Sequence, residues 1–148
     1  MAKSSADRSS LSTADYARLA AFRYALRSFL HFSEAATARV GLTGQQYQAM
    51  LVVRSREEGP PVSIAGLAGE LLIKHNSAVG LADRLVAQGL MLRERAPGDR
   101  RIVQLRLTQK GERILGRLAR VHRAKLRRIG PDIHRALMLL SGAWREGS

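Results

Sequence analysis

The amino-acid sequence predicts a mainly α-helical fold that carries one small β-hairpin. Most of the chain places apolar residues at a spacing close to 3.6, which is the repeat of an amphipathic helix. Between residues 91 and 107 the spacing changes to alternation, which is the repeat of a strand with one buried face. Pro97 and Gly98 interrupt this alternation and predict the turn of a hairpin.

The first predicted element is a long helix over about residues 12–40. Its apolar positions follow the helical repeat, Ser12 or Thr13 is suited to cap its start, and Gly41 ends it. Residues 1–11 are polar and predict a flexible N-terminal tail.

Three shorter helices are expected to follow, each with a start or stop signal. Thr43 opens a capping box, Ser63 caps the second of these helices, and Gly89 ends the third. The predicted spans are about 44–58, 64–71 and 76–88.

The hairpin and the C-terminal helices complete the prediction. The strands cover residues 91–95 and 102–107, and Thr108 caps a long fifth helix. The Gly130-Pro131 pair is expected to end that helix and to begin a last one. An isolated hairpin is not stable alone, so it must pack on the preceding helices. A short helix, a turn, a second helix and a hairpin form the layout of a winged helix-turn-helix.

Composition points to a polyanionic partner. The chain has 148 residues with 25 Lys and Arg against 12 Asp and Glu, a net charge of +13. Nucleic acid is the first candidate and an anionic membrane surface the second, although a GC-rich genome also produces arginine-rich chains. The absence of cysteine excludes disulfides and thiolate metal sites. No signal peptide or membrane-spanning run is evident, so a cytoplasmic protein is expected.

The start of the second helix of this motif carries a cluster of hydrogen-bonding side chains. In helix-turn-helix proteins this end of the helix faces the base edges of the major groove, where Asn pairs with adenine and Lys with guanine. An alternative is that Asn76 or Ser77 only caps the helix. Asp83 is expected to orient an Arg through an ion pair. The candidate DNA-binding residues of the motif are Ser63, Lys74, His75, Asn76, Ser77, Gly80 and Arg84.

The hairpin tip adds a second candidate contact. Arg100 and Arg101 are adjacent cations on a narrow projection, which suits insertion into the minor groove. Asp99 is expected to brace the turn or one of these arginines. The alternative is an ordinary solvated hairpin tip. The densest basic run lies elsewhere, since residues 109–130 hold eight basic residues and one acidic residue. Its role is left open between approach to DNA phosphates and a solvated helix face.

Two stretches resemble the MarR (multiple antibiotic resistance regulator) family. The segment from Ser63 to Gly89, with Asp83-Arg84-Leu85, is similar to that family's helix-turn-helix. Residues 97–101, Pro-Gly-Asp-Arg-Arg, are similar to its wing and precede Leu105-Arg106-Leu107-Thr108. The resemblance implies a single domain over residues 12–148. Its winged unit spans about 43–108, and its dimerisation helices span about 12–40 and 109–146.

The resemblance also implies a function. A homodimer would place its two recognition helices in successive major grooves of a pseudo-palindromic operator, about 10 base pairs apart. Such proteins typically repress transcription and release DNA when a small anionic or phenolic ligand binds. The candidate ligand-binding residues are Arg23, Tyr24, His31 and Tyr47. Tyr47 is alternatively a core residue and Arg23 a surface cation.

The sequence also bears on two other functions. An enzyme is not expected, because the four His residues form no metal-ligand or nucleophile-base spacing and no glycine-rich phosphate loop is present. No metal or cofactor is predicted. A charge-driven architectural protein without sequence preference is the main alternative, and it predicts a steep dependence of binding on salt.

Overall fold

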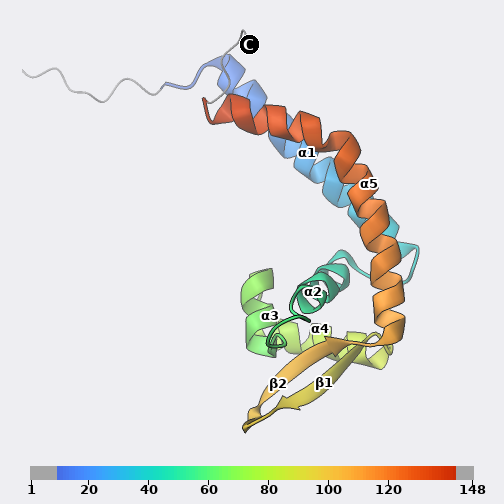
Figure 1. Ribbon diagram of the computed structural model, residues 1–148. Coiled ribbons are helices and arrows are strands. Elements are labelled where there is room, and N and C mark those ends of the chain that lie inside the picture. The colour runs from blue at the N-terminus through green and yellow to red at the C-terminus, as the bar shows by residue number, and fades with distance from the viewer. Residues whose placement is uncertain (1–9, 143–148) are drawn as a thin grey trace, which may run out of the picture. The chain divides into compact units, whose positions relative to one another are not determined.

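The computed structural model describes residues 10–142, which form five helices and one two-stranded antiparallel sheet (Figure 1). The expected mainly α-helical fold with a single hairpin is therefore confirmed. The described residues form two compact units, one of residues 33–122 and one of residues 10–32 with 123–142. The elements are α1 Thr13–Ala38, α2 Gly44–Ser55, α3 Ile64–Leu71, α4 His75–Ala87, β1 Met91–Ala96, β2 Asp99–Leu107 and α5 Gln109–Leu140.

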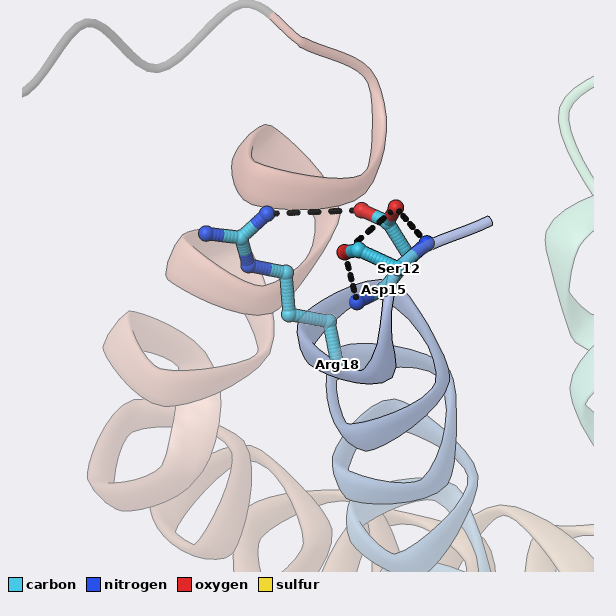
Figure 2. A network of polar contacts seen from close by, with 3 residues as sticks. All are labelled: Ser12, Asp15 and Arg18. Atoms are coloured by element: carbon cyan, nitrogen blue, oxygen red, sulfur yellow. Dashed lines mark hydrogen bonds and ion pairs between the residues drawn. The ribbon is translucent and has the colours of Figure 1, made fainter. Parts of the chain in front are cut away.

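Helix α1 begins with a reciprocal cap that Figure 2 shows in detail. The Asp15 backbone N–H donates to the Ser12 hydroxyl at 3.1 Å, and the Ser12 backbone N–H donates to the Asp15 carboxylate at 2.8 Å. Ser12, rather than Thr13, is thus the capping residue. The hydrogen bond from the Ser12 backbone, followed by the one from its hydroxyl, lowers the pKa of Asp15. Arg18 adds an ion pair at 3.5 Å.

The unit of residues 33–122 is built around one apolar core. Helices α2, α3 and α4 and the inner face of the hairpin each contribute side chains that are at most 1% exposed. Burial of each such side chain contributes roughly 1.5–3 kcal/mol to folding. The most buried large side chains include Met50, Leu67, Leu81, Leu85 and Leu105.

The hairpin is attached to the helices through its backbone. Strands β1 and β2 pair antiparallel, with Met91 opposite Leu107 and an irregular register at Arg95/Ala96. The Leu105 N–H donates to the Val62 carbonyl at 2.9 Å, just before α3 begins. This bond fixes the sheet against the start of the helix-turn-helix, which an isolated two-stranded ribbon needs for stability.

Helix α5 starts in close contact with the end of α4. The Thr108 hydroxyl donates to the Gly89 carbonyl at 2.6 Å and accepts the Gly111 N–H at 3.0 Å. A Cβ at Gly111 would lie 2.1 Å from the Leu90 carbonyl oxygen. Only glycine permits this approach without a shift of the backbone.

The expected break at Gly130-Pro131 is wrong, because α5 continues through Pro131 to Leu140. Proline removes one helical hydrogen bond, but its φ near −65° is a helical value. Ile129 before it and Ala136 after it line the same hollow against α1. The helix therefore accommodates Pro131 without a break.

Three smaller expectations need correction. Helix α4 starts at His75 rather than Asn76, and β2 starts at Asp99 rather than Ile102. Val121, which the helical repeat of apolar residues predicts on the buried face of α5, is 47% exposed. The buried face of α5 instead consists of Gly111, Leu115, Leu118 and His122. The flexible tail predicted over residues 1–11 lies mostly outside the described residues, as does the end of the last predicted helix.

We expect Gly111→Ala to lower the free energy of unfolding by about 1–3 kcal/mol, because the new methyl group overpacks the Leu90 backbone. Gly116→Ala in the same helix is the matched control. There a Cβ would meet only Arg120 Nη1, at 3.6 Å. We expect that substitution to stabilise the chain by about 1 kcal/mol. Urea unfolding at one fixed protein concentration measures both, and equal effects would contradict the close approach at Gly111.

Candidate nucleic-acid interface

The start of α4 presents its polar side chains to solvent. Lys74 is the N-cap residue by its backbone, with φ −67° and ψ 150°, and no side chain caps this helix end. The capping alternative for Asn76 and Ser77 is therefore wrong. His75, Asn76 and Ser77 occupy the first turn and are exposed. Unpaired backbone N–H groups of a first turn favour phosphate oxygens, so these side chains and the helix end can act together.

The turn before α4 contains a residue that the sequence prediction missed. Leu72 adopts the left-handed conformation with φ 55°, and it is 92% exposed. A left-handed leucine is disfavoured by roughly 1–2 kcal/mol. The Ile73 N–H donates to the Ala68 carbonyl at 3.0 Å and fixes this turn. An apolar side chain therefore projects into solvent immediately before the polar cluster, where it is available to contact a base methyl group or a sugar.

Gly80 and Arg84 continue the same exposed face of α4. A Cβ at Gly80 would meet only Arg84 Nη1, at 3.6 Å, so the Arg84 side chain lies over the glycine. Arg84 forms no ion pair with any residue in the range 10–142. Its positive charge therefore remains available to a phosphate. The absence of a side chain at Gly80 leaves space that the Arg84 guanidinium occupies.

Asp83 pairs with Arg93 of β1, as the sequence analysis expected for an unspecified arginine. Arg93 Nη2 also donates to the Val79 carbonyl at 3.5 Å. The pair connects α4 to the first strand of the hairpin. Helix α4 and the hairpin both carry candidate DNA-binding residues, and this ion pair connects them at the surface.

The hairpin tip is braced from within. Asp99 Oδ1 accepts the Arg101 backbone N–H at 3.0 Å and Arg101 Nε at 3.2 Å. The backbone hydrogen bond, followed by the side-chain bond, lowers the pKa of Asp99. Arg95 Nη1 donates to the Arg100 carbonyl at 2.6 Å, and Gly98 has φ +88°. The expected bracing role of Asp99 is confirmed, while the Arg101 side chain remains 91% exposed.

An open hollow connects α4 to the hairpin. It has a volume of about 470 Å³ and is mostly apolar, with Val79 and Ile102 among its lining residues. Three predicted DNA-binding residues, Ser63, His75 and Arg101, line it together. Ser63 also caps α3 by accepting the Gly66 N–H at 3.0 Å. Asn76, Ser77, Gly80 and Arg84 do not line this hollow and lie along α4.

The predicted ligand-binding residues fall into two groups. Tyr47 is 6% exposed in the core of the larger unit, and burial raises the pKa of its hydroxyl. Arg23, Tyr24 and His31 lie on α1 and are exposed. Tyr24 lines a hollow of about 310 Å³ between α1 and α5 that Lys125 also lines.

A buried polar cluster lies beside Tyr47. The His122 ring stacks on Tyr47 with 4.3 Å between ring centroids, and Nε2 lies 2.8 Å from the Ser33 hydroxyl. His122 Nδ1 lies 2.7 Å from the Leu118 carbonyl and therefore donates to it. The burial of His122 was not predicted from the sequence. The spacing of Leu115, Leu118 and His122 on one helical face would have indicated its burial.

Neither metal-holding groups nor membrane-spanning helices are found among residues 10–142. No group of three or more acidic, His or Cys side chains within residues 10–142 is placed to hold a metal ion. None of the helices in that range is both long and apolar enough to cross a membrane.

Comparison with known proteins identifies the segment that contains these sites. Residues 40–102 match the MarR family model. Over these residues the chain is similar to the MarR family. The matched segment starts two residues after α1 ends and runs through α2, α3, α4 and β1 to Ile102 of β2. It includes both the exposed start of α4 and the braced tip.

Solved structures extend the likeness to nearly the whole chain. AbsC, a MarR family transcriptional regulator from Streptomyces coelicolor, is 23% identical with a TM-score of 0.74, over 91% of this chain and 92% of AbsC. The repressor CouR bound to a 23-mer DNA duplex is 26% identical with a TM-score of 0.68, over 91% and 98%. CouR from Rhodococcus jostii RHA1 bound to p-coumaroyl-CoA is 20% identical with a TM-score of 0.69, over 86% and 94%. No curated protein matches by sequence.

We expect Arg101→Ala in the braced hairpin tip to weaken binding to duplex DNA by about 1 kcal/mol or more. The slope of log affinity against log salt should fall by about 1, because one cation leaves the phosphate contacts. Titration of a labelled duplex at several salt concentrations measures both quantities. Arg39→Ala removes the same charge from another exposed position and serves as the control. Identical losses in the two variants would contradict the assignment of the wing.

Proposed function

We propose that this chain is a sequence-specific, double-stranded DNA-binding transcriptional regulator that acts as a repressor in the cytoplasm. The observation that carries the proposal is the exposed and uncapped polar cluster of Lys74, His75, Asn76 and Ser77 at the start of α4. Asn and Lys at this helix end are suited to adenine and guanine edges in the major groove. The braced tip with Arg101 would enter an adjacent minor groove.

A homodimer is part of this proposal. Helix α1 exposes Leu19, Leu26 and Leu30 at 40%, 39% and 52%, and α5 exposes Leu126 and Leu137 at 43% and 46%. Large apolar side chains repeated along two helices support contact with another apolar surface. A second copy would cover them and would present a second α4 to the next major groove. The preferred DNA would then be a pseudo-palindrome with half-sites about 10 base pairs apart.

Control by a small ligand is also proposed. CouR, with the same fold, is described both bound to DNA and bound to p-coumaroyl-CoA. An anionic or phenolic ligand would contact Arg23, Tyr24 or His31 and would favour a conformation that no longer fits the operator. A ligand shifts such an equilibrium only by its difference in affinity for the two states.

The second candidate is a charge-driven architectural binder. The net charge of +13 favours it, because charge alone supports binding to any duplex. It differs from the regulator in one respect that is measurable, since it has no sequence preference.

Selection of bound duplexes from a random DNA pool at about 0.15 M salt tests the two candidates. We expect a pseudo-palindrome with half-sites one helical turn apart. Bound duplexes with no shared sequence would support the architectural binder and contradict the regulator.

We expect Asn76→Ala to reduce affinity for the selected operator by about 1–3 kcal/mol, because a bidentate base contact is lost. Affinity for a scrambled duplex should change little. Competition binding with both duplexes gives the ratio of the two affinities. Ser55→Ala, at the exposed end of α2, serves as the control. Equal losses on both duplexes would make Asn76 a backbone contact.

A further inference from the structure

The outer face of α5 carries an open hollow of about 580 Å³ in the larger unit. Five residues of α5 line it, namely Glu112, Arg113, Gly116, Arg117 and Arg120. These arginines occupy helical positions i, i+4 and i+7, so they lie on one face. That face points away from the core, because the buried face of α5 is formed by Leu115, Leu118 and their helical neighbours.

The charge of this hollow is not compensated within residues 10–142. None of Arg113, Arg117 and Arg120 takes part in an ion pair among these residues. The nearest acidic residue, Glu112, is instead engaged by Arg54 at 3.1 Å. Like charges three and four positions apart destabilise a helix. A bound anion would relieve that repulsion.

Gly116 at the centre of the hollow has no packing role that requires glycine. A Cβ there would meet only Arg120 Nη1, at 3.6 Å, which is ordinary van der Waals contact. At Gly111, one turn earlier, the Leu90 carbonyl oxygen excludes any Cβ. Glycine in a helix interior is destabilising, so its presence at residue 116 is not explained by the packing of this chain. Its effect is to remove a side chain from between three guanidinium groups.

The geometry points to a binding site for a compact polyphosphate anion in this hollow, separate from the DNA-contacting face of α4. Guanidinium groups bind phosphoryl oxygens in bidentate fashion. The three arginines span about 10 Å along the helix, which suits two or three linked phosphoryl groups better than a single phosphate. The volume of this hollow lies in the range of small-molecule sites.

The test is a calorimetric titration of the full chain with inorganic pyrophosphate and tripolyphosphate at constant ionic strength. The combined variant R113Q/R117Q/R120Q removes the three charges and keeps good helix-forming residues. Gly116→Leu fills the hollow and leaves every charge in place. The matched control R27Q/R39Q/R128Q removes three other exposed arginines, none of them in an ion pair within residues 10–142. Circular dichroism verifies that each variant retains its helices.

We expect the combined variant and Gly116→Leu each to weaken tripolyphosphate binding at least tenfold, while the control changes it less than threefold. An equal loss in the two triple variants would show diffuse attraction to net charge and overturn the site. Unchanged binding by Gly116→Leu would overturn the role of the hollow. If the hollow variants instead bind tripolyphosphate normally and lose affinity for a duplex, the arginines contact the DNA backbone and the proposal is wrong.

Discussion

The contact between the end of α4 and the start of α5 fixes the geometry of the winged unit. The Thr108 N–H donates to the Leu90 carbonyl at 3.1 Å, and Lys110 Nζ donates to the Gln88 carbonyl at 3.2 Å. Gly111 permits the two backbones to come together. Thr108 follows directly after β2 and Leu90 directly precedes β1, so one junction closes the base of the hairpin. The direction of the hairpin away from α4 is therefore set at its base and not at its tip.

This junction leaves the opposite end of α4 available for recognition. The C-terminus of α4 is occupied by contacts to α5, while its N-terminus carries polar side chains with no capping role. The Asp83–Arg93 pair and the bond from Leu105 to Val62 then hold the hairpin against both helices of the motif. Exposed ion pairs contribute little to stability, so the value of the Asp83–Arg93 pair is positional. It places β1 and α4 on one surface that faces outward.

Local signals in the sequence predicted most of the fold, because they act between residues close in the chain. The Thr43 capping box and the turn at Gly98 are examples, and both are present. The prediction failed where a distant partner decides the outcome. Pro131 does not end α5, and Ile129 before it and Ala136 after it line the same hollow as α1. Asn76 is a residue type that often caps helices. Helix α4 nevertheless begins at His75, and Lys74 is its N-cap residue.

The placement of the acidic residues explains why the basic surface divides into distinct regions. Asp83, Asp99 and Glu112 each engage an arginine, and each of these pairs lies beside arginines that remain unpaired within residues 10–142. Asp99 holds Arg101 by its Nε and backbone N–H, so the guanidinium retains donors for another anion. Glu112 is held by Arg54 and leaves Arg113, Arg117 and Arg120 uncompensated. Paired acids position the basic side chains of the tip, whereas the uncompensated face of α5 has only mutual repulsion. The outer face of α5 is therefore stabilised more by a bound anion than the hairpin tip, whose arginines are already braced. The two regions differ chemically in this respect, although both are positively charged.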